Sequence, residues 1–138
     1  MALPIQDLAT RSGGCLCGQV RYEARGAPVN VRACHCRLCQ RATGQPFYAR
    51  VLFRAEDLDV TGDYGRYPSS EHLDRGFCRT CGTTLFSIRH AAGLMSVALA
   101  SLDEPDAFRP EEHIWLCSKL AWVCVEEGVD EYPEAAPA

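Results

Sequence analysis

The sequence lacks an apolar run long enough to cross a membrane. A membrane helix requires about 20 consecutive apolar residues, and the longest candidate, around Leu94 to Leu102, is short and interrupted by serines. The opening segment, MALPIQDLAT, lacks the basic region and following apolar stretch of a secretory signal. We therefore expect a cytoplasmic protein that does not act at a membrane.

The sequence also lacks an excess of positive charge. With 14 basic and 18 acidic residues, its formal net charge is −4. Of the 14 basic side chains, all but Lys119 are arginines. Nonspecific binding of nucleic acid needs a basic face that attracts phosphates, so we expect no nucleic-acid partner.

Helix signals are scarce, and no internal repeat is present. The 11 glycines and 8 prolines interrupt the chain at short intervals, while 47% apolar residues are enough for a core. These features predict one mostly β domain over residues 1–138, with its core at about 12–123 and loose ends at 1–12 and in the acidic tail, about 129–138. We expect strands at 18–23, 47–53, 83–88 and 95–99, and short helical turns after Cys39 and at 104–108.

Cysteine, in contrast, is abundant. There are nine, an odd number, and without a secretory signal a disulfide framework is a poor interpretation. Two cysteines stand alone, and we expect these to be small buried hydrophobes. The isolated ones are Cys117 and Cys124, and the other seven form the clusters Cys15 and Cys17, then Cys34, Cys36 and Cys39, then Cys78 and Cys81.

The outer two clusters supply four thiols. Cys15 and Cys17 are two residues apart, so an extended chain directs both to one face. Cys78 and Cys81, followed by a glycine, have the spacing of a zinc knuckle. Together they predict a closed, tetrahedral structural zinc site, the alternative being two buried or redox-active cysteine pairs.

The middle cluster, Cys34, Cys36 and Cys39, supplies only three thiols. Three protein ligands and a free fourth position are typical of catalytic zinc. Three thiolates make zinc a weak Lewis acid that favours a further sulfur ligand, and coordination would hold an incoming thiol as thiolate. Two alternatives stay open: His35 or a distant residue closes a second structural site, or the cluster binds no metal.

Arginines surround the middle cluster. No Asp or Glu occurs from Ala24 to Ala55, and arginine pairs with carboxylates in a bidentate manner. We therefore interpret Arg37 and Arg41 as candidate contacts for a carboxylate substrate, whereas the alternative is that the arginines neutralise the metal clusters or are solvated. The run contains Arg25, Arg32, Arg37, Arg41, Arg50 and Arg54.

The cysteine motifs also carry a family resemblance. The ordered segments GGCLCG (13–18), CHCRLCQRATG (34–44), FCRTCGTTLF (77–86) and HIWLCSKLAW (113–122) resemble the glutathione-dependent formaldehyde-activating enzyme family, which includes centromere protein V. The resemblance implies a β-tent of stacked antiparallel sheets, with structural zinc on the outer four cysteines and catalytic zinc on the middle three. It also implies that Gly44, Gln45, Pro46 and Phe47 line the site next to the metal.

The resemblance implies a carbon–sulfur lyase that joins glutathione and formaldehyde into S-(hydroxymethyl)glutathione. On this interpretation Cys34, Cys36 and Cys39 are catalytic, and Arg37, Arg41, Gln45 and Phe47 contact substrate. The cofactors are two zinc ions per chain, the partners a small thiol and a small aldehyde, and a homodimer is compatible with the sequence. The alternative function is a non-catalytic zinc-, thiol- or protein-binding module. Cys117 departs from the family pattern, where a polar, non-thiol residue is expected.

Overall fold

The computed structural model describes residues 9–137, and its smaller sheet has three antiparallel strands. These are β1 (Thr10–Gly14), β2 (Arg21–Arg25) and β5 (Leu58–Thr61), in the order β1-β2-β5. Successive side chains of a strand point to opposite faces. In β2, Tyr22 and Ala24 are accordingly buried while Arg21, Glu23 and Arg25 are exposed, so one face of this sheet packs into the core.

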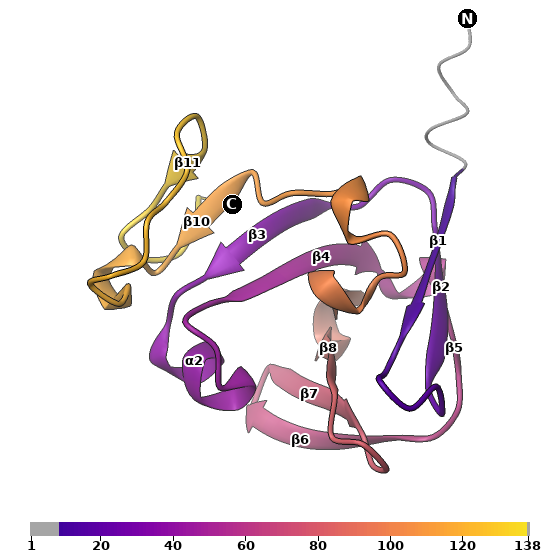
Figure 1. The fold of residues 1–138 in the computed structure, drawn as a ribbon. Helices are drawn as coiled ribbons and strands as arrows, with labels where there is room; N and C mark the ends of the chain where they lie inside the picture. The colour runs from indigo at the N-terminus through magenta and orange to yellow at the C-terminus, as the bar shows by residue number, and fades with distance from the viewer. Residues whose placement is uncertain (1–8, 138) are drawn as a thin grey trace, which may run out of the picture.

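The larger sheet has eight strands in the order β11-β10-β3-β4-β9-β8-β7-β6 (Figure 1). Neighbouring strands are antiparallel except that β10 runs parallel to both β3 and β11. The strands are β3 (Asn30–Cys34), β4 (Tyr48–Arg54), β6 (Tyr64–Ser70), β7 (Leu73–Cys78), β8 (Thr84–Arg89), β9 (Leu94–Ala98), β10 (Glu112–Ile114) and β11 (Asp130–Glu131).

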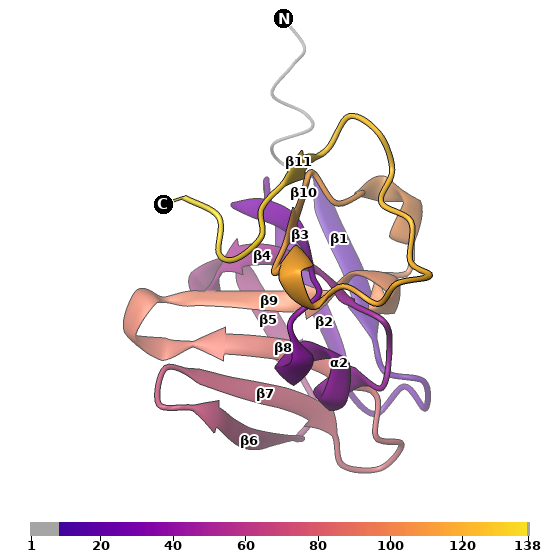
Figure 2. The same ribbon diagram turned by 90° about the vertical axis from the view of Figure 1, so that its left-hand side faces the viewer.

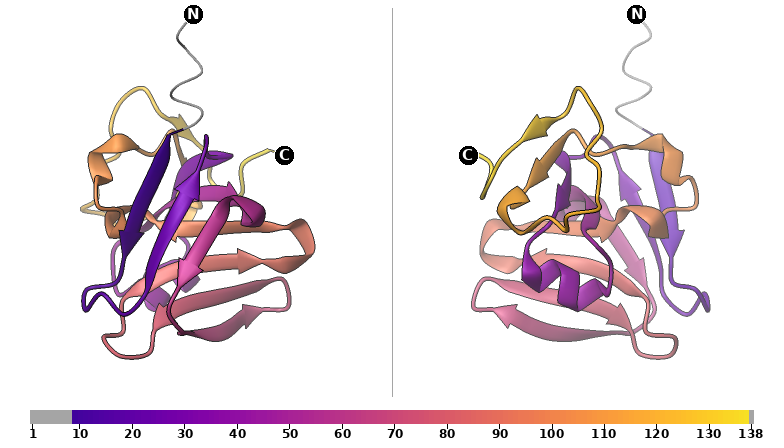
Figure 3. Two further views of the ribbon diagram at one scale, coloured as in Figure 1. Left: turned by 90° about the vertical axis from the view of Figure 1, so that its right-hand side faces the viewer. Right: turned by 60° about the vertical axis from the view of Figure 1, so that its left-hand side comes forward.

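The core lies where the small sheet crosses the large one (Figure 3, left). From the large sheet, Val51, Phe53, Phe86 and Val97 are each at most 1% exposed and pack in one cluster with Tyr22 of β2. The rings of Tyr22 and Phe86 meet edge-on, with centroids 5.6 Å apart. The large sheet therefore uses the odd positions of β4 and β9 for its core, together with Leu85, Phe86 and Ile88 of β8.

The opposite face of the large sheet is partly covered by the single α-helix of the described residues, α2 (Arg37–Thr43), which lies in front of β7 and β8 in Figure 2. Its N-cap is Cys36, whose Sγ accepts a hydrogen bond from the Cys39 amide. The helix ends at Gly44, which adopts the left-handed conformation (φ 70°) that favours glycine. Short 3-10 turns complete the connections: η1 (Ala55–Asp57), η2 (His90–Ala92), η3 (Leu99–Ser101), η4 (Pro105–Ala107) and η5 (Leu116–Ser118).

The predicted mostly β fold of stacked antiparallel sheets is confirmed. The strands expected at 47–53, 83–88 and 95–99 are present within one residue at each end, while the one expected at 18–23 is a turn followed by β2. The helical turns after Cys39 and at 104–108 are α2, which already begins before that cysteine, and the 3-10 turn η4. No helix among the described residues is long and apolar enough to span a membrane.

The two ends of the chain depart from expectation. Residues 1–8 lie outside the described part, but β1 already begins at Thr10. The segment expected to fray after Val129 instead forms β11, and its backbone carbonyls at Tyr132 and Glu134 accept hydrogen bonds from the amides of Leu116 and Trp115. The composition of this segment did not predict β11, because its pairing depends on backbone groups rather than on an apolar pattern.

Candidate metal centres and cavity

Four cysteines from distant parts of the chain meet in one group. The turn after β1 carries Cys15 and Cys17, and the end of β7 and the turn that follows carry Cys78 and Cys81. Their four Sγ atoms all lie within 4.8 Å of one another. We call this set the four-cysteine group.

The sulfur spacing of the four-cysteine group fits a tetrahedral zinc site. Zinc–sulfur bonds of about 2.3 Å place two ligand sulfurs about 3.8 Å apart. The Sγ atoms of Cys15 and Cys17 are 3.7 Å apart, and those of Cys17 and Cys78 are 3.8 Å apart. All nine cysteines are free of disulfide bonds. The residues present therefore fit a closed four-sulfur metal site.

Backbone amides support these sulfurs as acceptors. The Val20 amide lies 3.3 Å from Cys15 Sγ, and the amides of Thr80 and Cys81 lie 3.4 and 3.5 Å from Cys78 Sγ. The Thr83 hydroxyl, 3.1 Å from Cys81 Sγ, lowers the pKa of that thiol to about 5. Donors of this kind stabilise thiolate, which is the form that binds metal.

A second group contains Cys34, Cys36 and Cys39, and we call it the three-cysteine group. Cys34 ends β3, Cys36 caps α2 and Cys39 lies in its first turn, which brings their sulfurs within 4.8 Å of one another. Among residues 9–137, no fourth Cys, His, Asp or Glu belongs to this set, and His35 is not a member. The group can hold a metal ion with three sulfurs.

The three-cysteine group holds thiolate charge unevenly. The Cys34 thiol lowers the pKa of Cys39 to about 5, and the guanidinium of Arg75 lowers it further. Nη2 of Arg75 lies 3.7 Å from Cys39 Sγ. Conversely, the neighbouring Cys39 thiolate and burial raise the pKa of Cys34. The Cys39 thiol is thus more readily deprotonated than that of Cys34.

The three-cysteine group forms one wall of a cavity of about 480 Å³. The floor is the face of the large sheet opposite the core, with Tyr48, Arg50 and Leu52 at alternate positions of β4. Trp115 stands at the cavity with an unusual positive φ of 59°, which turns the chain from β10 into η5. A small molecule in this cavity would reach the three sulfurs.

The predicted substrate contacts separate in the structure. Arg37 lines the cavity, whereas Arg41, Gln45 and Phe47 do not. Arg41 and Gln45 border a shallow surface hollow on the outside of α2. Phe47 instead packs on the His35 ring, with centroids 5.0 Å apart, and with Gln45 borders a different hollow near Thr84. The three-cysteine group therefore has only one of the four predicted contacts beside its cavity.

Sequence reasoning missed two arginines of the cavity wall, Arg75 on β7 and Arg89 on β8. Both lie far along the chain from the middle cysteines, so proximity in sequence gave no signal. The alternation from Phe86 to Arg89 would have been informative, because Phe86 and Ile88 face the core while Ser87 and Arg89 face the cavity.

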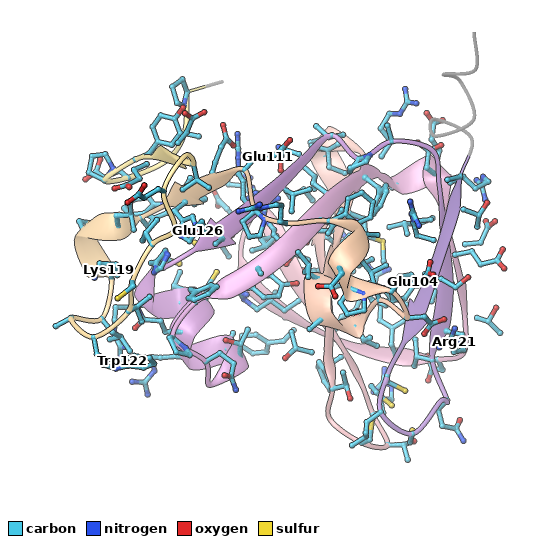
Figure 4. The ribbon with its side chains drawn as sticks, turned by 45° about the horizontal axis from the view of Figure 1, so that its top comes forward. Arg21, Glu104, Glu111, Lys119, Trp122 and Glu126 are labelled. Atoms are coloured by element: carbon cyan, nitrogen blue, oxygen red, sulfur yellow. The ribbon has the colours of Figure 1, made fainter. Side chains whose placement is uncertain are left out.

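His113 and the two isolated cysteines near the C-terminus differ in burial. His113 is 2% exposed and pairs with His35, as a structural histidine would. Cys117 and Cys124 are exposed, so the expectation that they are buried is wrong. Figure 4 shows Lys119, Trp122 and Glu126 at the end of the molecule that carries α2, away from Arg21 and Glu104 beside the small sheet.

Comparison with known proteins matches most of the chain. A family model described as "Glutathione-dependent formaldehyde-activating enzyme" matches residues 10–118, which include both cysteine groups. A Schizosaccharomyces pombe protein named as an uncharacterized lyase is 32% identical over 74 residues, or 54% of this chain and 54% of that protein. This alignment thus spans about half the length of the curated relative.

A solved structure supports the fold. The crystal structure of a Rhodobacter sphaeroides protein resembles this chain with a TM-score of 0.57 and 26% sequence identity. The likeness covers 72% of this chain and 96% of that one. The family match ends before β11, so the C-terminal strand and Glu126 lie outside it.

Proposed function

The chain belongs to the glutathione-dependent formaldehyde-activating enzyme family, and from this premise we propose that it is a zinc-dependent carbon–sulfur lyase. Its substrates would be a small thiol and a small aldehyde, as in the formation of S-(hydroxymethyl)glutathione from glutathione and formaldehyde. The observation that carries the proposal is the convergence of three cysteine sulfurs, without a fourth protein ligand in residues 9–137, on the wall of a cavity.

The two cysteine groups would have different tasks. Zinc on the four-cysteine group would fasten the turn after β1 to the end of β7, which closes a long loop and adds folding free energy. Cys34, Cys36 and Cys39 would hold the second zinc. When bound there, zinc supplies an open coordination position at which a thiol is held as thiolate.

The side chains of the cavity would orient the reactants. Arg37 and Arg50, which line the cavity, would bind a carboxylate of the thiol, and Arg75, 3.7 Å from Cys39 Sγ, would hold this sulfur in position. A sulfur–carbon bond forms between thiol and aldehyde, and the thiol proton ends on the former carbonyl oxygen. The reaction therefore needs neither oxidant nor reductant. The substrate contacts expected of three further residues stay predictions, because Arg41, Gln45 and Phe47 do not line this cavity.

The test is the rate of adduct formation, measured by NMR exchange with zinc-loaded protein, glutathione and formaldehyde. We expect the wild type to accelerate exchange and Cys36→Ser to abolish the acceleration while leaving the fold intact. The matched control is Cys117→Ser, which removes an exposed cysteine outside both groups. A wild type no faster than Cys36→Ser would refute catalysis at this site.

A further inference from the structure

Four arginines line the cavity beside the three-cysteine group, and no Asp or Glu does. They come from three strands and the helix, so they surround the space rather than form a stripe on one element. A cavity with this lining attracts anions from several sides. The four are Arg37, Arg50, Arg75 and Arg89.

None of these four arginines forms an ion pair with a carboxylate of residues 9–137. Arg50 donates to the Asn30 side chain at 2.9 Å, and Arg75 donates to Ser69 Oγ at 3.0 Å. Other arginines of the chain do find carboxylates, as Arg21 does with Asp103. Carboxylates of the described residues therefore do not neutralise the positive charge of the cavity, although the Cys39 sulfur lies beside Arg75.

Burial makes this arrangement costly without a ligand. The burial of Arg50 lowers the pKa of its guanidinium, and the nearby charge of Arg32 lowers it further. The side-chain partner of this half-buried guanidinium is the neutral Asn30 amide, and a buried cation without an anionic partner is unfavourable. An anion bound in the cavity would relieve this penalty.

Two hydroxyls lie beneath the cavity floor. Tyr48 and Ser96 are 5% and 0% exposed and both line the cavity. Neither hydroxyl makes a hydrogen bond of normal geometry with another described side chain, although Ser87 and Ser96 lie near Tyr48. Both oxygens are covered, so the contacts proposed for a ligand depend on the arginines.

The sheet register aligns these groups. Arg75 of β7 is opposite Ser87 of β8, Ser87 is opposite Ser96 of β9, and Ser96 is opposite Leu52 of β4. Cross-strand neighbours of this kind lie side by side on one face. Arg75, Ser87 and Ser96 therefore follow one another across the floor, with apolar Leu52 at one end of the row and the Arg75 contact with Cys39 at the other.

We propose that this cavity selects a small thiol that carries two or more anionic groups and no ammonium group. Four guanidiniums favour the anions, in bidentate fashion for carboxylate or phosphate. The lining holds four guanidiniums and no carboxylate, so the anionic groups that an ammonium could meet there are the cysteine sulfurs that would hold the zinc. The inference rests on the proposed function, in which a thiol substrate enters this cavity. It predicts that glutathione, which carries an ammonium group, binds more weakly than such a thiol, although its adduct can still be turned over.

Binding to zinc-loaded protein tests the proposal, with calorimetry as the readout. We expect mercaptosuccinate, a thiol with two carboxylates, to bind at least tenfold more tightly than glutathione. Acetylating the amine of glutathione removes its positive charge, and the acetylated thiol should bind at least fivefold more tightly than glutathione. The proposal is overturned if glutathione binds as tightly as both of these ligands.

A matched pair of variants locates the selectivity. Arg89→Gln should lower the affinity for mercaptosuccinate at least fivefold. It should leave the affinity for uncharged 2-mercaptoethanol unchanged, because Arg89 lines the cavity without touching a cysteine. Arg109→Gln removes an exposed arginine outside the cavity and should change neither ligand. Equal losses for both thiols in Arg89→Gln would contradict a role in anion selection.

Succinate separates this proposal from the lyase function. It has two carboxylates and no thiol, so it should compete with mercaptosuccinate whether or not adducts are turned over. Competition without turnover would refute the lyase and leave the anion cavity standing. Turnover of the glutathione adduct without competition by succinate would refute the anion selectivity and leave the lyase standing.

Discussion

His35 Nε2 lies 2.8 Å from Nδ1 of His113, and both rings are buried. Burial lowers the pKa of His35 to about 4, so its ring is neutral at physiological pH. Glu126 Oε1 lies 2.8 Å from Nε2 of His113, on the side of the ring away from His35. This pair joins β10 to the segment between Cys34 and Cys36.

We expect the histidine pair to contribute measurable coupling free energy. His113→Ala removes the partner of a buried ring and should lower the free energy of unfolding by about 2 kcal/mol. A double-mutant cycle with His35→Ala, followed by urea unfolding of zinc-loaded protein, should give a coupling energy of about 1 kcal/mol. Additive effects of the two substitutions would show that the contact stabilises nothing. His72→Ala is the control, because His72 is exposed.

Loss of the four-cysteine group should destroy the fold. Cys78 is 1% exposed and belongs to both the core cluster and this group. We expect Cys78→Ser to lose one zinc and to lose cooperative thermal unfolding, because structural metal carries folding free energy. Circular dichroism and metal analysis measure this. A folded Cys78→Ser protein with full zinc would show that our division of ligands is wrong.

The cysteine motifs made the metal groups predictable from the sequence, since ligand spacing is a local property. The cavity was not, because Arg75 and Arg89 reach it only through the register of β7, β8 and β9. Similarly, β11 depends on backbone hydrogen bonds to β10 that its acidic, proline-rich composition does not predict. The prediction of a strand at 18–23 was wrong at its start, because Gly18 has a φ of 81° and lies in a turn before β2.

The two metal sites should release zinc in a fixed order. Four thiolates in a closed group retain the ion more strongly than three beside an open cavity. Titration with a graded chelator, followed with a colorimetric zinc indicator, should show two phases. The first phase should be missing in Cys36→Ser and unchanged in Cys117→Ser. A single phase that includes all the zinc would contradict distinct sites.

Close packing at Gly13 should make this position intolerant of a side chain. A Cβ there would lie 2.3 Å from Tyr22 Oη and 2.6 Å from the Ser101 carbonyl oxygen. The Tyr22 hydroxyl cannot move freely, since it is hydrogen-bonded to Ser101 Oγ at 2.7 Å. Gly13→Ala should therefore cost about 2 kcal/mol in urea unfolding. Ser12→Ala, one residue away, should change the free energy of unfolding by less than about 0.5 kcal/mol. Equal losses of stability in the two variants would contradict close packing at Gly13.

X-ray absorption at the zinc edge, combined with zinc stoichiometry, tests the central claim most directly. The account predicts two zinc ions per chain, one with four protein sulfurs and one with three. Adding mercaptosuccinate should bring a fourth sulfur to the second zinc and leave the first unchanged. Four protein ligands on both ions, with no change on addition of thiol, would establish the closed, non-catalytic alternative. Protein that binds no zinc would contradict the account as a whole.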